Sequence, residues 1–126
     1  MSFESILREI VETCGGGLAI GLMGTDGIPI AQVEARPRPG LEMLLEDDIG
    51  TAGVEFASIL SEIGKASDAL GGGSVIETVV SLTRFSLVFR HVDEDTVLVL
   101  ALSPDGNLGK ARYLMRRHMP ALRDEF

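Results

Sequence analysis

Two glycine triplets, at residues 15–17 and 71–73, divide the chain into segments of different hydrophobic periodicity. Each triplet follows a stretch in which apolar residues recur at helical spacing, and each precedes a stretch typical of strands. Glycine tolerates the left-handed backbone conformation that commonly ends a helix. The triplets therefore predict two helix ends, each followed by a change to β-structure.

The other segments complete this pattern. The sequence predicts helices over about residues 3–14, 41–70 and from 108 onward, and strands over about 18–23, 28–33, 74–81, 84–91 and 96–102. An Asp26-Gly27 pair predicts a hairpin turn, residues 35–40 with two prolines predict a loop, and Pro120 is expected to end or kink the last helix. The order α-β-β-α-β-β-β-α predicts an α/β (α+β) fold, with one five-stranded antiparallel sheet and three helices.

Length and charge limit the function classes. The 126 residues predict a single domain over 1–126, and a net charge of −8 disfavours nucleic acid as a partner. We expect no membrane contact and no signal peptide, because no apolar run approaches about 18 residues and no basic segment opens the chain. A lone Cys14 excludes an internal disulfide and predicts a cytoplasmic location. Residues 108–126 differ from the rest, with 5 basic and 2 acidic side chains on an otherwise acidic body.

The middle helix carries two apolar stripes. The first is an unbroken heptad seam that consists of Leu45, Ile49, Ala52, Phe56, Ile59, Ile63, Ala66 and Leu70. The second is rich in small residues and consists of Gly50, Gly53, Ala57, Leu60 and Gly64. One seam is enough to dock a helix on a sheet, and a helical glycine costs about 1 kcal/mol, so the second stripe indicates close approach of another backbone. That backbone belongs either to the chain's own sheet or, the interpretation we favour, to the same helix in a second copy.

The sequence contains no recognisable catalytic or ligand-binding motif. No glycine cluster has the spacing of a phosphate loop, and His91 and His118, on different elements, have no carboxylate at metal-ligand spacing. Cys14 falls on an apolar helix face and is expected to be a core residue. We therefore expect no catalytic residue, no cofactor and no metal, and we expect that the protein is not an enzyme.

The second half of the chain resembles the Roadblock (dynein light chain) family. The resemblance rests on residues 84–90 (RFSLVFR), 97–102 (VLVLAL) and 103–112 (SPDGNLGKAR), together with the Asp26-Gly27 hairpin and the order of elements. It covers about residues 3–119 and is closest to compact bacterial members, including the gliding-motility (Mgl) type that regulates a Ras-like GTPase.

The resemblance implies a homodimer whose sheets join through the third strand and whose middle helices pack together. The dimer residues it implies are Gly50, Gly53, Ala57, Leu60, Gly64, Val75, Glu77 and Val79. It also implies a platform for a small Ras-like GTPase, without an arginine finger, and the exposed residues expected at its rim are Glu55, Glu62, Lys65 and Asp68. The first hypothesis is therefore a non-catalytic dimeric GTPase regulator, and the alternative is a dimeric adaptor for motility, polarity or signalling complexes that touches no GTPase. A small-molecule sensor needs a pocket with convergent polar groups, and it ranks last because the predicted sheet is dense with Val, Leu and Phe.

Overall fold

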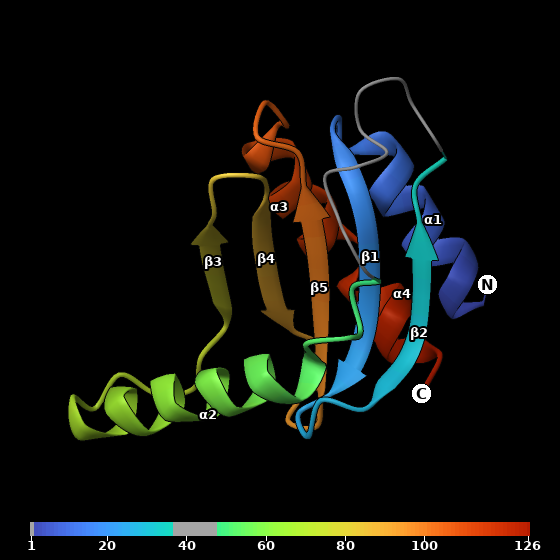
Figure 1. Cartoon of the computed structure of the whole chain (residues 1–126). Coiled ribbons are helices and arrows are strands. Elements are labelled where there is room, and N and C mark those ends of the chain that lie inside the picture. Colours follow the sequence, from blue (N-terminus) through green and yellow to red (C-terminus); the bar gives the residue numbers. More distant parts are fainter. Residues whose placement is uncertain (1, 37–47) are drawn as a thin grey trace.

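The computed structural model describes residues 2–36 and 48–126 and contains a central sheet with helices on both faces (Figure 1). The helices are α1 (Phe3–Thr13), α2 (Gly53–Ala69), α3 (Leu108–Arg117) and α4 (Met119–Asp124). The strands are β1 (Gly17–Gly24), β2 (Pro29–Glu34), β3 (Glu77–Ser81), β4 (Ser86–His91) and β5 (Thr96–Leu102). The predicted order of elements is confirmed, except that the last helix is divided into two. Within the described residues, no helix is both long and apolar enough to cross a membrane.

The five strands form one antiparallel sheet in the order β2-β1-β5-β4-β3, which confirms the predicted fold class. β1 and β5 pair along nearly their whole length at the centre, with Ile20 opposite Leu100. Every residue of β5 is buried. A strand whose two faces are both apolar needs cover on both sides, so the sheet requires helices on each face.

One face of the sheet is covered by α1, α3 and α4. α1 contributes Ile6, Leu7 and Ile10, which are fully buried, and α3 contributes Ala111 and Met115. These side chains pack against the β-residues of the same face, including Leu98 and Leu100 of β5. The other face carries a smaller cluster, in which Leu60 of α2 packs with alternate residues of β4 and β5 such as Phe89 and Val99.

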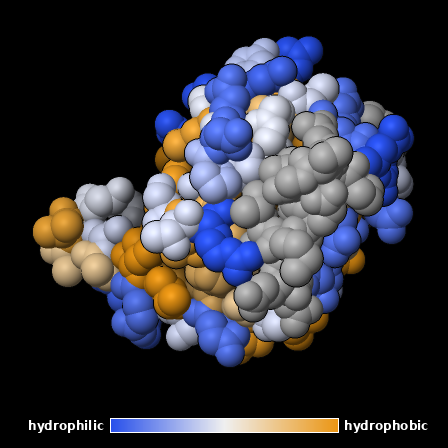
Figure 2. Space-filling model, turned by 45° about the horizontal axis from the view of Figure 1, so that its top comes forward, coloured by the Kyte–Doolittle hydropathy of each residue, from blue (hydrophilic) through white to orange (hydrophobic). Residues whose placement is uncertain are grey.

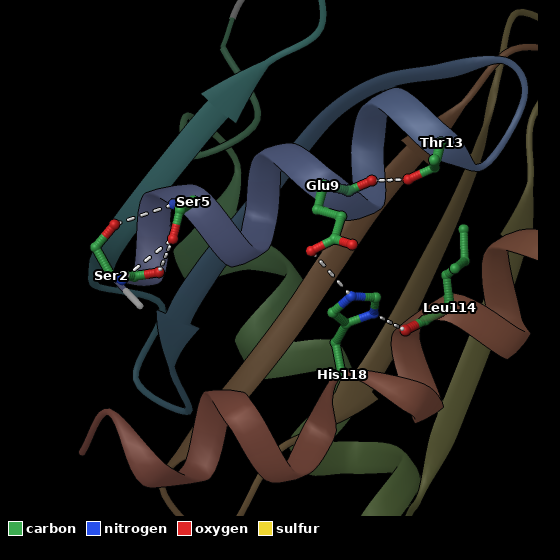
Figure 3. Close-up of polar contacts among 6 residues, drawn as sticks. All are labelled: Ser2, Ser5, Glu9, Thr13, Leu114 and His118. Carbon is green, nitrogen blue, oxygen red and sulfur yellow. Dashed lines mark hydrogen bonds and ion pairs between the residues drawn. The ribbon is translucent and has the colours of Figure 1, made fainter.

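Local hydrogen bonds fix the ends of these helices (Figure 3). The Ser2 hydroxyl caps α1 by accepting from the backbone N–H of Ser5 at 3.1 Å, and the Ser5 hydroxyl accepts from the Ser2 N–H at 3.1 Å. The break between α3 and α4 falls at His118, whose Nδ1 donates to the Leu114 carbonyl at 2.8 Å and whose Nε2 lies 3.5 Å from Glu9 on α1. Pro120 occupies the first turn of α4, where its missing N–H is tolerated.

The middle helix begins later than the sequence predicted. Residues 41–47 of the predicted span lie outside the described residues, and residues 48–52 form turns before α2 starts at Gly53. Gly53 approaches the hairpin turn closely, because a Cβ at this position would lie 2.5 Å from the carbonyl oxygen of Gly27. Gly27 itself has a φ of 87°, which favours glycine.

Both stripes of α2 contribute to the chain's own core, because Phe56 and Ile63 of the heptad seam pack against the same cluster as Leu60. Gly53, Ala57 and Leu60 of the glycine-containing stripe are buried against their own chain, whereas Ile59 and Leu70 of the heptad seam are 53% and 88% exposed. The close approach that the glycines indicated is therefore made, at Gly53, to the turn of the same chain. The heptad pattern did not distinguish the two stripes, because both are apolar over four turns.

We expect Gly53→Ala to destabilise the fold by about 1–3 kcal/mol, since its methyl group overlaps a backbone oxygen that cannot move independently. Gly64→Ala is the matched control: no atom lies within 4 Å of a Cβ there, and alanine favours a helix interior by up to about 1 kcal/mol. Urea unfolding of both variants at one protein concentration measures the difference. Equal effects would contradict the close approach at Gly53.

Candidate interaction surface

The C-terminal half of α2 projects beyond the edge of the sheet. In Figure 1 the helix crosses the strands and continues past β3, and in Figure 2 hydrophobic atoms lie at this projecting end. Several large apolar side chains along α2 and β3 are exposed. They are Val54, Ile59, Leu70, Ile76, Val79 and Leu82. Several large apolar side chains exposed on neighbouring elements of a folded chain are typical of an interaction site.

β3 is an edge strand that leaves one row of backbone groups without a strand partner. It pairs with β4 on one side only and ends the sheet. Ile76 and Leu82 flank it, and Val79 at its centre is 39% exposed. Such an edge can accept an added strand from another chain.

A groove of about 950 Å³ separates the projecting half of α2 from the adjacent ends of β4 and β5. Leu60, Ile76 and Val97 give it apolar walls, and Lys65 and Asp68 belong to its charged lining. The Lys65 Nζ lies 3.2 Å from Glu62 Oε1, and both side chains are about 70% exposed. Glu55, Glu62, Lys65 and Asp68, the rim residues inferred from the resemblance, are all exposed on α2.

A second pocket of about 370 Å³ lies at the start of α2. Phe56, Phe85 and Phe89 line it, and the rings of Phe56 and Phe89 have centroids 5.1 Å apart. Its polar lining comes from Asp48, Thr51 and Arg84. The pocket is predominantly aromatic and aliphatic.

The remaining residues of the expected dimer set differ in their environments. Gly50 lies close to β2, since a Cβ there would be 3.0 Å from the Gln32 amide nitrogen, and Gly64 faces open space. Val75 is partly buried and lines the groove. Val79 is exposed on the edge strand.

Glu77 is held inside the chain by two arginines. Its Oε2 lies 2.9 Å from Arg90 Nη1 on the neighbouring strand β4, and its Oε1 pairs with Arg112 on α3. Glu77 and Arg90 face each other in the strand register. The carboxylate side chain is only 12% exposed, so the side chain of Glu77 fastens the edge strand to α3. Sequence reasoning missed this role, although opposite charges at paired strand positions are a detectable signal.

His91 also lines the groove and is electrostatically unusual. Its Nδ1 is buried without a hydrogen-bond partner, and desolvation by burial lowers the pKa of the imidazole below 6.5. The ring is therefore neutral at pH 7.

Among residues 2–36 and 48–126, no group of three or more His, Cys, Asp or Glu side chains could hold a metal ion.

The two loop arginines of the sequence analysis have different outcomes. Arg36 pairs with Glu12 of α1 at 3.2 Å, and Arg38 lies outside the described residues. Cys14, at the end of α1, is fully buried in the hydrophobic core, as predicted from its place on the apolar face of the helix.

Solved structures share this architecture. The chain is 36% identical to MglC from Myxococcus xanthus over 100% of both chains, with a TM-score of 0.69. The gliding protein MglB from Thermus thermophilus is 23% identical, with a TM-score of 0.78 over 94% of this chain and 84% of that chain. A Roadblock/LC7 domain from Streptomyces avermitilis is 17% identical, with a TM-score of 0.81 over 98% and 97%.

Neither the protein-family models nor the curated proteins contain a match to this sequence. The identity to MglC over the full chain, together with the shared fold, places the protein in a family: the chain belongs to the Roadblock/LC7 family, close to its Mgl-type members. The resemblance stated from the sequence is thereby confirmed.

The lowered pKa of His91 predicts acid-sensitive stability. Below about pH 6.5 the unfolded chain binds a proton that the folded chain resists, so the contribution of the neutral ring is complete above that pH and is lost as pH falls toward the folded pKa. We expect His91→Leu to reduce the loss in free energy of unfolding between about pH 7.5 and pH 5.5. Urea titrations at the two pH values measure it, and an unchanged difference in the variant would assign the acid sensitivity to other groups.

Proposed function

We propose that the protein is a homodimeric, non-catalytic regulator that binds a small Ras-like GTPase in the cytoplasm. One observation carries the proposal: large apolar side chains are exposed on α2, up to Leu70 at its projecting end, and on and beside the edge strand β3. Membership of the Roadblock/LC7 family and the likeness to MglC and MglB support it. In this proposal residues 1–126 act as a single domain with no catalytic residue or bound cofactor.

The dimer contact is assigned to the residues that the fold leaves open. A second copy adds its own β3 to the free edge and lays its α2 against the exposed side of this helix, as two-fold symmetry requires. The side chains of Ile59, Leu70 and Val79 then become buried in the interface, while Gly64 and Val75 lie within reach of the second copy. The side of α2 that packs on its own chain carries Gly53, Ala57 and Leu60, and Gly50 precedes the helix, so these four residues act indirectly by positioning α2. Glu77 contributes its backbone at the edge of the sheet.

The GTPase contact is assigned to the charged rim of α2. Glu55, Glu62, Lys65 and Asp68 are exposed, and rim charges mainly control association rate and salt dependence. Activation, where it occurs, comes from the surface that the dimer presents and not from an inserted arginine. Arg36, which the structure describes, lies in an exposed ion pair with Glu12 of α1.

An adaptor that assembles motility, polarity or signalling proteins without touching a GTPase is the second candidate. The groove beside α2 favours it, because a volume of about 950 Å³ with mixed apolar and charged lining suits a peptide segment of a partner. Binding to purified Ras-like GTPase separates the two hypotheses.

We expect light scattering after size exclusion to give about twice 13.5 kDa for the natural chain at micromolar concentration. Ile59→Asp combined with Leu70→Asp should give a monomer, because two desolvated charges would oppose the contact. Ile28→Asp, at a 62% exposed isoleucine beside the opposite edge strand, is the control and should remain dimeric. A monomeric natural chain at high concentration would overturn the proposed dimer.

Reversal of charge at Glu55 and Glu62 together should weaken GTPase binding, most strongly at low salt. Glu34→Lys on β2 is an exposed control that should bind normally.

Arg36→Ala combined with Arg38→Ala should leave stimulated single-turnover GTP hydrolysis within about tenfold, whereas loss of an arginine finger costs about 10³ to 10⁵. The assay uses a purified Ras-like GTPase. A thousandfold loss would show that the loop supplies a catalytic arginine.

A further inference from the structure

The exposed side of α3 carries basic residues that the proposed function leaves unexplained. Ala111 and Met115 bury the opposite side of the helix, while Lys110, Tyr113, Arg116 and Arg117 are exposed. Lys110 and Arg116 lie three residues before and after Tyr113, and Arg117 lies four residues after it, so all three cations neighbour the one tyrosine of the chain. We name these four residues the cationic face of α3.

The cations of this face make no ion pair within the described part of the chain. Elsewhere in that part, cationic side chains have partners: Arg8 and Arg36 pair with Glu12, Lys65 with Glu62, and Arg90 and Arg112 with Glu77. Arg123 donates to the Val92 carbonyl at 2.8 Å, and Arg84 also has a partner. Arg117 reaches only the Tyr113 hydroxyl, at 3.2 Å.

The chain as a whole carries a net charge of −8. The sequence contains nineteen acidic side chains, yet in the described residues none of them forms an ion pair with the three cations of this face. These cations flank a tyrosine that is 49% exposed. Free arginines offer paired N–H donors with the geometry of a carboxylate. Tyrosine and arginine are also the residue types enriched in protein interfaces.

We propose that the cationic face of α3 docks an acidic segment, rich in Asp or Glu, of a partner protein. A nucleic acid is disfavoured because its phosphates would be repelled by the acidic body. An anionic membrane is disfavoured because such binding uses clusters of about 4–8 Lys and Arg, and this face has three free cations. A short acidic segment contacts only one helix face, so it is not repelled by the acidic surface of the rest of the molecule.

The face is independent of the surface proposed for the dimer and the GTPase. α3 covers the sheet face that carries α1 and α4, whereas α2 covers the other face (Figure 1). An acidic segment can therefore bind α3 while α2 and β3 are occupied. The protein would then join two partners on opposite sides of one sheet.

The test uses the full chain and a short fluorescein-labelled peptide rich in glutamate, followed by fluorescence anisotropy at low ionic strength. We expect binding that Arg116→Glu weakens about tenfold or more, because the new charge repels the peptide. Arg36→Glu makes the same change in net charge at an exposed arginine outside α3 and should leave the affinity unchanged within about twofold. Arg116→Gln removes the charge without reversal and should weaken binding by about threefold, which provides a second variant if the reversal disturbs folding.

Three results would overturn the proposal. They are the absence of peptide binding at low salt, an equal loss in Arg36→Glu and Arg116→Glu, and tighter binding to phosphatidylserine vesicles or duplex DNA than to the peptide. Circular dichroism of each variant confirms that the fold is retained. The dimer and GTPase measurements do not involve α3, so they can fail while this proposal stands.

Discussion

The pairing of β1 with β5 at the centre of the sheet is the interaction on which the rest of the structure depends. Both strands are buried on their two faces, so neither face of the sheet can be left to water. Three helices cover one face with a large apolar cluster. The single helix α2 covers the other, where its approach is limited by the backbone contact between Gly53 and Gly27. Because α2 lies across the strands and continues beyond them, the same helix that closes the core also presents apolar side chains to solvent (Figure 1).

The elements that follow from local chemistry were predicted from the sequence. The bounds of β5 agree to the residue, and the Asp26-Gly27 turn and the helix end before Gly71 lie where glycine chemistry placed them. The start of α2 was not predicted, because the apolar spacing continues through residues 48–52 although these form turns. The side of α2 that faces the sheet is set by tertiary contacts such as the close approach of Gly53 to Gly27, and such a long-range contact has no signature in helical periodicity. The role of Glu77 was missed for a similar reason, since one of its two arginines is 35 residues away.

Charge is distributed unevenly over the two faces of the sheet. α2 carries its carboxylates and Lys65 on exposed positions, whereas α3 on the opposite face carries unpaired cations. Glu77 links these regions, because it sits on the edge strand and binds both Arg90 of the sheet and Arg112 of α3. The edge of the sheet and the charge on α3 are therefore coupled through one side chain.

The two edges of the sheet also differ in their protection against uncontrolled association. β2 begins with Pro29, which cannot donate to an added strand, and a register shift between Leu22 and Met23 interrupts its pairing with β1. β3 has no proline and no lysine, and its one charged side chain is turned toward α3. Natural sheets commonly place proline, lysine or a β-bulge at exposed edges to prevent aggregation. β3 relies instead on its length of only five residues and on the inward-turned charge of Glu77, so its backbone is more open to an added strand than that of β2.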